Sequence, residues 1–310
     1  MNFDPVKSVD TFIVTIPRDV PYLGPLSDGD RLTSRGYIVR KGNVTFYPPV
    51  DRSVRVRVTT DDGRVGGADT YGLCAPKVIT ELINDVLGPL LIGRNPADAS
   101  AIWDEFYDLM RVRGYTGGFY CDALAAIDIA LWDIAAQHAG VSLGTLLGGI
   151  RRETIPAYVS GLPAPTVEEK VDLAQAWQAK GFSDVKFAAA VSYEGVEREF
   201  AALREALGAS ANIAVDLHWK YTPAEAIALA DALQPHAPWF LEAPVKPEDP
   251  QALAHVREKS RASIAAGEEW RTDFDAILRI RCAAIDIIQP EMAHTGVTQF
   301  MRMTRLAALH

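Results

Sequence analysis

The chain has 310 residues, of which 48% are hydrophobic and 23% charged, and its formal net charge at pH 7 is -9. A chain of this size and apolar content can bury a large core, which excludes a disordered protein. The negative charge and the lack of a basic run oppose binding to DNA, RNA or an anionic membrane, so we expect a small-molecule partner.

Residues 1–140 have the pattern of strands followed by helices. Val54, Val56 and Val58 alternate with arginines before a turn at Asp62-Gly63, which predicts a hairpin with one buried face. Apolar residues then recur at helical spacing in DALAAIDIALWDIAAQH. The pattern predicts an α+β domain.

Residues 141–310 repeat a short apolar strand followed by a helix, which predicts an α/β fold with a parallel sheet. Asp216, Glu242 and Glu268 each close such a strand and follow one another at intervals of 26 residues. That spacing favours successive units of a TIM-type (β/α) barrel. An open doubly wound sheet is the alternative, but the glycine-rich phosphate turn that it commonly carries is missing.

The barrel predicted from this spacing is incomplete. The segment after Ile150 holds about six units, whereas a closed barrel has eight strands. We therefore expect either a polypeptide that continues past His310 or another element that covers the exposed edges.

The strand ends predict which side chains face the barrel interior, because residues two apart in a strand share a face. A capping box from Thr222 to Glu225 places a helix start just after Asp216 and His218. Val215 and Leu217 should then face the helices. The expected inward residues are Asp216, His218, Phe240, Glu242, Ile264, Ala266 and Glu268.

Three carboxylates at one rim need a compensating charge. Two carboxylates about 4 Å apart repel by about 4 kcal/mol at an effective dielectric constant near 20. Oxygen ligands without Cys or His point to Mg²⁺ bound by Asp216, Glu242 and Glu268. The alternative is that each acid only caps the helix after its strand.

Taken together, these motifs resemble the enolase superfamily, in particular its mandelate racemase and sugar-acid dehydratase branch. The resemblance covers the α+β cap, ALAAIDIALWDIAAQ with LLGG, the lysine in DVKF, the acids in VDLH, FLEAP and AAGEE, and IIQPEMAHTGVTQ. It implies Mg²⁺ on the three acids, a carboxylate substrate and a homo-oligomer. It also implies that cap loops near residues 22–35 and 114–120, with Tyr120, contact the substrate. The shared chemistry is removal of a proton next to a carboxylate, which gives an enediolate stabilised by the metal.

Within the resemblance, four positions bear on the reaction. Lys186 matches the first lysine of a Lys-x-Lys pair, but Ala188 stands at the second, and Glu291 stands where lactonising members have a lysine. His218 matches an Asp-x-His pattern, which implies a general acid for a departing 3-hydroxyl. Glu291 occupies the position of an acid that orients a histidine base on a seventh strand.

The resulting hypothesis is dehydration of a sugar acid to a 2-keto-3-deoxy acid. Lys186 would contact the substrate carboxylate or enediolate, and His294 is expected to be a loop residue. Lys220 is expected to continue the inward face beyond the rim and to reach a substrate hydroxyl or carboxylate, with a flexible, solvated lysine as the alternative. The alternatives are a racemase or epimerase of a hydroxy acid, and a catalytically inactive, truncated homologue that serves as an assembly subunit.

The compartment is predicted from the cysteines and the N-terminus. Cys74, Cys121 and Cys282 are far apart and odd in number, so we expect three core residues in a reducing compartment. Neither an export signal nor an apolar run long enough to span a membrane is found. The expected location is the cytoplasm.

Overall fold

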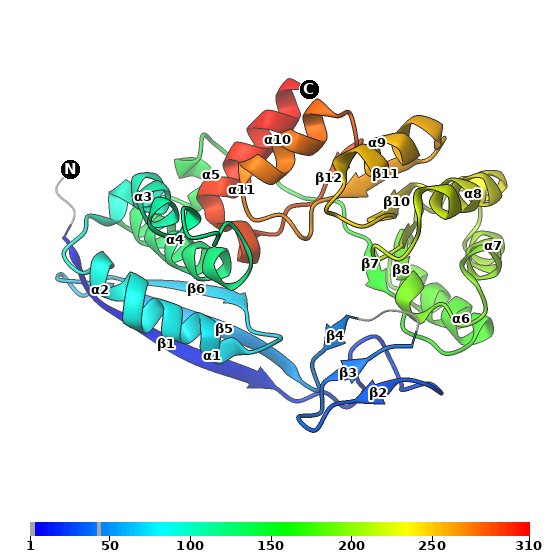
Figure 1. Ribbon diagram of the computed structural model, residues 1–310, viewed down its shortest axis with the longest axis horizontal. Coiled ribbons are helices and arrows are strands. Elements are labelled where there is room, and N and C mark those ends of the chain that lie inside the picture. Colours follow the sequence, from blue (N-terminus) through cyan, green and yellow to red (C-terminus); the bar gives the residue numbers. More distant parts are fainter. Residues whose placement is uncertain (1–3, 42–44) are drawn as a thin grey trace.

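The computed structural model describes residues 4–41 and 45–310 (Figure 1). The expectation of a chain without an export signal includes residues 1–3, which lie outside the described residues. No helix of the described part is long and apolar enough to cross a membrane.

An antiparallel sheet and a layer of helices form the N-terminal cap. The sheet order is β1 (Val6–Ile16), β5 (Asp51–Thr60), β6 (Val65–Tyr71), and the predicted hairpin between β5 and β6 is confirmed. Val54, Val56 and Val58 are fully buried beneath the helices. The helices are α1 (Pro76–Glu81), α2 (Gly88–Leu91), α3 (Ala99–Arg111), α4 (Gly118–Ala139) and the short α5 (Leu143–Leu146).

A second, smaller sheet of the cap lies below the barrel strands in Figure 1. It consists of β2 (Arg31–Leu32), β3 (Ile38–Val39) and β4 (Phe46–Tyr47), which lie in that order and run antiparallel to their neighbours. The buried guanidinium of Arg40 donates to the carbonyls of Tyr22, Gly24 and Pro25 and pairs with Asp30 at 2.9 Å. Arg40 therefore fixes the loop that precedes this sheet.

The C-terminal part is a parallel sheet whose six strands lie side by side in chain order. That order, with a helix after each strand, is the arrangement of a TIM barrel with six of its eight units. The strands are β7 (Val159–Gly161), β8 (Val185–Ala188), β9 (Ile213–Asp216), β10 (Phe240–Glu242), β11 (Ser263–Ala266) and β12 (Ile287–Ile288). The helices outside it are α6 (Val167–Gln178), α7 (Val196–Leu207), α8 (Pro223–Leu233), α9 (Pro250–Lys259) and α10 (Asp273–Arg281).

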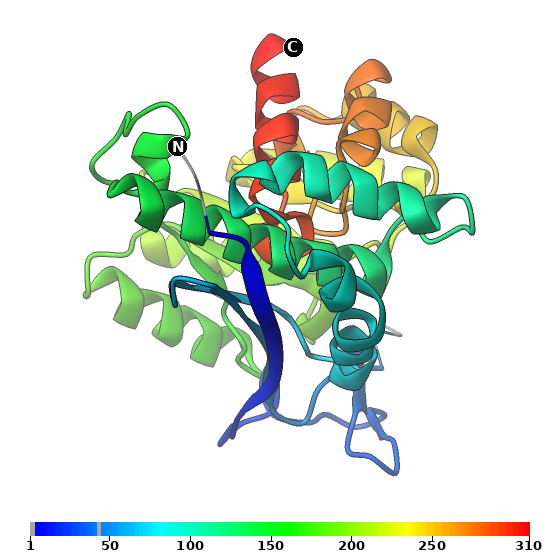
Figure 2. The same cartoon turned by 90° about the vertical axis from the view of Figure 1, so that its left-hand side faces the viewer.

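The last helix, α11 (Met292–Leu309), returns to the cap and packs along α4 (Figure 2). It is broken at Gly296, whose φ is 68°. The Asp128 carboxylate accepts hydrogen bonds from the backbone N–H and hydroxyl of Thr298, at 2.8 and 2.6 Å. A Cβ at Gly296 would lie 2.6 Å from Asp128 Oδ2, so the close approach of the two helices requires glycine there.

The barrel interior confirms part of the predicted alternation. Val215 and Leu217 belong to the core between sheet and helices, and Phe240 belongs to an inner cluster with Ala214 and Ala265. The prediction was wrong for Ile264 and Ala266, which face the helices. Ile264 pairs with Leu241 of the neighbouring strand, and paired residues face the same side of a sheet. Because Leu241 faces the helices, Ile264 does so too.

The cysteines differ in burial although all three are unpaired. Cys121 is buried, as expected for a core residue, whereas Cys74 and Cys282 are only partly buried. Cys282 Sγ accepts a hydrogen bond from the Gln251 amide at 3.1 Å. Cys282 nevertheless packs against the barrel core, so the core-residue interpretation is wrong only for Cys74.

Candidate active site

Three carboxylates meet at the C-terminal ends of neighbouring barrel strands. One oxygen each of Asp216, Glu242 and Glu268 lies within 4.8 Å of the other two. Asp216 and Glu242 end β9 and β10 and pair directly in the sheet register. The helix-capping alternative fails, because the N-caps of α8, α9 and α10 are Thr222, Asp249 and Thr272.

The position of Glu268 in this cluster does not follow from the alternation of side chains along β11. Strand β11 ends at Ala266, and Gly267 has φ 141°. A Cβ on Gly267 would lie 2.8 Å from the backbone nitrogen of Gln289. The glycine lets the chain turn beside β12, so that Glu268 enters the interior although Ala266 faces outward.

The electrostatics of the cluster favour a bound cation. Burial, with the charges of Asp216, Glu291 and Glu242, raises the pKa of Glu268 to about 7. Burial and Asp216 also raise the pKa of Glu242, although the Lys186 ammonium opposes this rise. A set of three carboxylate oxygens that repel one another fits a divalent ion with oxygen ligands, such as Mg²⁺.

Lys186, on β8, lies at the floor of the same site. Its ammonium forms an ion pair with Glu242, which also accepts a hydrogen bond from the Gln289 amide at 3.1 Å. Burial alone would lower the pKa of Lys186, but the charges of Glu242 and Asp216 outweigh it and raise the pKa. Lys186 is therefore a fixed positive charge beside the acids.

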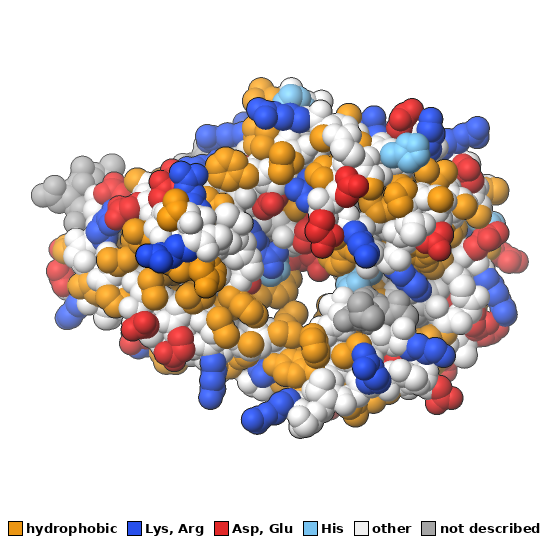
Figure 3. All heavy atoms as spheres, in the orientation of Figure 1, with side chains coloured by type: hydrophobic (Ala, Val, Ile, Leu, Met, Phe, Trp, Pro, Cys, Tyr) orange, Lys and Arg blue, Asp and Glu red, His pale blue; other side chains and the backbone are white. Residues whose placement is uncertain are grey.

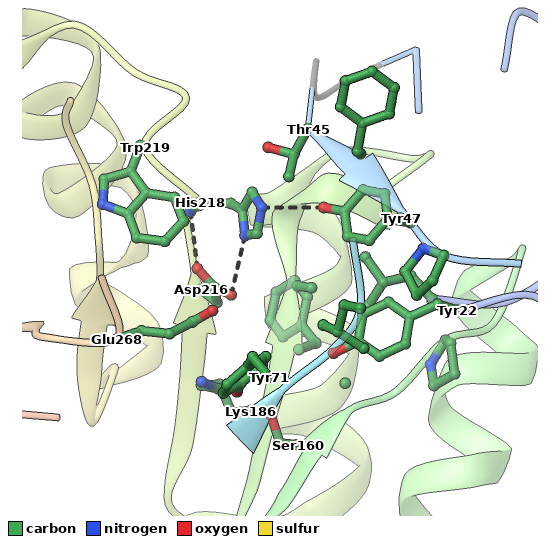
Figure 4. A pocket seen from close by; sticks show the side chains of 18 of the residues that line it. Tyr22, Thr45, Tyr47, Tyr71, Ser160, Lys186, Asp216, His218, Trp219 and Glu268 are labelled. Atoms are coloured by element: carbon green, nitrogen blue, oxygen red, sulfur yellow. Dashed lines mark hydrogen bonds and ion pairs between the residues drawn. The ribbon is translucent and has the colours of Figure 1, made fainter. Parts of the chain in front are cut away.

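His218 lies above Asp216, between the barrel and the cap (Figure 4). Its Nδ1 is 3.6 Å from Asp216 Oδ2, and its Nε2 is 3.0 Å from the hydroxyl of Tyr47. Burial alone would lower the pKa of His218, but Asp216, Glu268 and Glu242 raise it overall. The imidazole is thus held in a negative field with one nitrogen toward the cap.

A backbone turn, rather than strand alternation, brings His218 to this place. Strand β9 ends at Asp216, and His218 and Trp219 have φ of 51° and 53°. The prediction that Lys220 continues the inward face was wrong for this reason. Lys220 is exposed and lines a separate hollow, whereas Trp219 lines the cavity with the acids.

The prediction that Tyr120 binds substrate was also wrong. Tyr120 is 1% exposed in the core of the cap, and its hydroxyl donates to the carbonyl of Phe106 at 2.5 Å. The expected loop over residues 114–120 runs into α4, which begins at Gly118, and none of its residues lines the cavity.

The cavity above the acids has a volume of about 440 Å³ and is walled by both parts of the chain. In the space-filling view of Figure 3, the face toward the viewer has a hollow near its middle, with acidic side chains and a histidine at its rim. Tyr22 comes from the predicted cap loop, whereas the segment 45–48 and Tyr71 were missed. The rigid sequence Tyr47-Pro48-Pro49 was a signal that could have indicated a fixed tyrosine.

Glu291 also lines the cavity, at the start of α11. Its carboxylate accepts a hydrogen bond from the Tyr71 hydroxyl. His294 is not the loop residue that we expected, because it lies in the first turns of α11 and is 8% exposed. Its ring stacks on Tyr71 with 3.9 Å between centroids, and its Nδ1 is 2.7 Å from Asp122 Oδ1.

Comparisons with known proteins agree with this architecture. Residues 49–148 match the mandelate racemase / muconate lactonizing enzyme N-terminal domain, and residues 169–310 match the enolase C-terminal domain-like family. The chain is 33% identical over 262 residues to D-galactarolactone cycloisomerase of Agrobacterium fabrum, covering 83% of this chain and 68% of that protein. It is 31% identical over 305 residues to a D-galactonate dehydratase family member of Catenulispora acidiphila, covering 86% and 68%.

Solved structures give the same result. A member of the enolase superfamily from Agrobacterium tumefaciens has a TM-score of 0.95 and 52% identity, covering 99% of this chain and 79% of that chain. A racemase from Streptomyces coelicolor with bound magnesium has a TM-score of 0.84 and 26% identity, covering 98% and 81%. The chain therefore belongs to the enolase superfamily, in its mandelate racemase / muconate lactonizing enzyme branch.

Proposed function

We propose that the chain is a Mg²⁺-dependent dehydratase of a sugar acid. The observation that carries the proposal is the position of His218, which lines the cavity beside Asp216 with Nε2 3.0 Å from the Tyr47 hydroxyl. Ala188 lines the same cavity where a second lysine would act as a base in a racemase. The named dehydratase relative supports this choice.

In the proposed reaction, a 2,3-dihydroxy acid loses its C2 proton and its C3 hydroxyl as water, and the resulting enol becomes a 2-keto-3-deoxy acid. Asp216, Glu242 and Glu268 would hold Mg²⁺, whose charge stabilises the enediolate formed when the proton leaves. Lys186 binds the substrate carboxylate, and His218 protonates the departing hydroxyl. Glu291 would orient the histidine that the resemblance places on a seventh strand, and that histidine would remove the C2 proton.

The geometry at His218 suits the role of an acid. Without a bound cation, Asp216 and its neighbours raise the pKa of His218. An imidazole titrates near neutral pH, so it can hold and release a proton there. Nε2 lies 3.0 Å from the Tyr47 hydroxyl, and His218 and Tyr47 both line the cavity, so a protonated imidazole can donate from Nε2 at this wall. A leaving hydroxyl placed there can accept the proton as its bond to C3 breaks.

Isomerisation is the second candidate function, and a specific observation favours it. The relative with 33% identity is named a cycloisomerase, whose name indicates conversion without loss of water. Racemisation or epimerisation is a further isomerase reaction that starts from the same enediolate. In all of these reactions the three acids and Lys186 would keep the same roles, and the later fate of the enediolate would differ. Dehydration expels the 3-hydroxyl, whereas racemisation returns a proton to the other face of C2.

The deciding experiment incubates the chain and Mg²⁺ with D-galactonate, D-gluconate, D-mannonate and D-galactarolactone in deuterated water. Dehydration predicts a 2-keto product with deuterium at C3. An isomer of unchanged mass, apart from deuterium at C2, would favour the second candidate. If Mg²⁺ binds and no acid reacts or exchanges its C2 proton, the enzyme proposal fails and an assembly role gains support.

The proposal also covers the compartment, the oligomeric state and the ligand of the enzyme. We place it in the cytoplasm because its three cysteines are free thiols, and we propose a homo-oligomer with a small carboxylate as ligand. Native mass spectrometry of the chain measures the oligomeric state directly.

A further inference from the structure

The carboxylate of Glu291 stands on the far side of the cavity from Lys186. Lys186 is on β8 and Glu291 follows β12, and three strands separate β8 from β12 in the sheet. Within the described residues, the carboxylate of Glu291 has one hydrogen-bond partner, the hydroxyl of Tyr71. That partner comes from β6 of the cap rather than from the barrel.

Tyr71 is itself held from two directions. Its ring stacks on the imidazole of His294, with 3.9 Å between centroids and 7° between planes. The preceding residue, Thr70, donates its hydroxyl to the backbone carbonyl of Ala293 at 2.6 Å. The end of β6 is therefore fastened to the first turn of α11, the turn that begins at Glu291.

The support for this stack continues into the cap. His294 Nδ1 is 2.7 Å from Asp122 Oδ1 on α4, and Arg271 Nε donates to the same oxygen at 3.0 Å. The side chains of Asp122 and His294 are almost completely buried. The ring that Tyr71 stacks on therefore has a fixed position, and so does the phenol hydroxyl.

Glu291 needs such a restraint because it faces another acid. Glu291 and Glu268 line the same cavity, and two carboxylates that share a cavity repel each other. An unrestrained glutamate could turn away from the cavity by rotation about its side-chain bonds. The donor from Tyr71 opposes that rotation.

We propose that Tyr71 is a positioning residue, supplied by the cap, that holds the Glu291 carboxylate in its working orientation in the cavity. The inference rests on the proposed function, because it assigns Tyr71 an effect on turnover that is exerted through Glu291. Docking of the cap on the barrel would then complete the catalytic arrangement as well as cover the substrate.

The test is a double-mutant cycle on the full chain with Tyr71→Phe, Glu291→Gln and the double variant. Phenylalanine keeps the stack on His294 and removes only the hydroxyl. We expect Tyr71→Phe to lower kcat by about 10²-fold with little change in KM, as for a misplaced catalytic group. The double variant should be no slower than Glu291→Gln alone. Additive losses, or a change in KM only, would overturn the inference.

A matched control and a spectroscopic measurement separate this inference from the proposed function. Tyr107→Phe also removes the hydroxyl of a stacked cap tyrosine, but one that packs on Trp103 and does not line the cavity, and it should keep kcat. With ¹³Cζ-labelled tyrosine, the resonance missing from Tyr71→Phe identifies Tyr71, and it should move in Glu291→Gln. An unmoved resonance refutes the contact. A wild-type chain that is inactive on every acid refutes the proposed function, and the resonance still decides whether Tyr71 holds Glu291.

Discussion

Removing one of the three crowded acids should stabilise the metal-free protein. The pKa of Glu268 is raised from 4.5 to about 7 in the folded state, mainly by burial. A raised pKa means that the folded state favours the neutral form, so its contribution to stability is complete below pH 4.5 and is lost as the pH rises through 7. A shift of this size corresponds to about 3 kcal/mol of unfolding free energy.

Glu268→Gln keeps the shape of the side chain and removes the charge. Without metal at pH 8, we expect the variant to be more stable than the wild type by up to about 3 kcal/mol, and near pH 4.5 the two should be similar. Saturating Mg²⁺ should reverse the order, because a ligand that binds only the folded wild type stabilises it.

Urea unfolding in EDTA, and then in Mg²⁺, measures these differences, with Glu197→Gln, an exposed acid on α7, as the matched control. The reasoning is refuted if metal-free Glu268→Gln is less stable than the wild type at pH 8. It is also refuted if Mg²⁺ stabilises the variant as strongly as the wild type.

Three other changes test the remaining parts of the account. His218→Asn should abolish dehydration but keep exchange of the C2 proton in deuterated water, and equal loss of both would show that His218 is not only the leaving-group acid. Gly296→Ala should lower the unfolding free energy by about 1–3 kcal/mol in urea, since its φ is 68° and its Cβ would press on Asp128, and an unchanged midpoint would contradict that packing. Arg40→Ala should destabilise the chain by about 3–5 kcal/mol, because the buried Asp30 carboxylate loses its guanidinium partner and keeps only two backbone donors, and a loss below about 1 kcal/mol would show that the pair does not hold the loop.

The sequence predicts the barrel and the acid cluster because both follow from local periodicity. Strands that end in an acid every 26 residues must bring those acids to one rim if the sheet is parallel. Asp216 and Glu242 lie within regular strands, so alternation places them correctly. The prediction holds in β9 and β10, but counting back from Glu268 put Ile264 and Ala266 on the wrong face of β11.

Beyond the strand ends the backbone is no longer extended, so the alternation of side chains between two faces does not apply. His218 and Trp219 have left-handed backbone conformations, which direct Lys220 away from the cavity. The positive φ of Gly267 directs Glu268 into it. Neither turn can be predicted from the two-residue alternation of a strand. Tyr120 illustrates a different limit, since helical spacing does not show which face of α4 meets the cap core.

Contacts between distant segments were the other part that the sequence could not reveal. Tyr47 meets His218 across 171 residues, and Tyr71 meets Glu291 across 220. Such pairs depend on how the cap docks on the barrel, which is a property of the whole fold. Tyr47 and Tyr71 were therefore recognised as cavity residues only from the structure.

The central claim is that Asp216, Glu242 and Glu268 jointly bind one divalent ion. Calorimetric titration of the EDTA-treated chain with Mg²⁺ at pH 8 tests it most directly. The account predicts one ion bound per wild-type chain and no binding by Glu242→Gln. Absence of binding to the wild type, or equal binding to the variant, would contradict it.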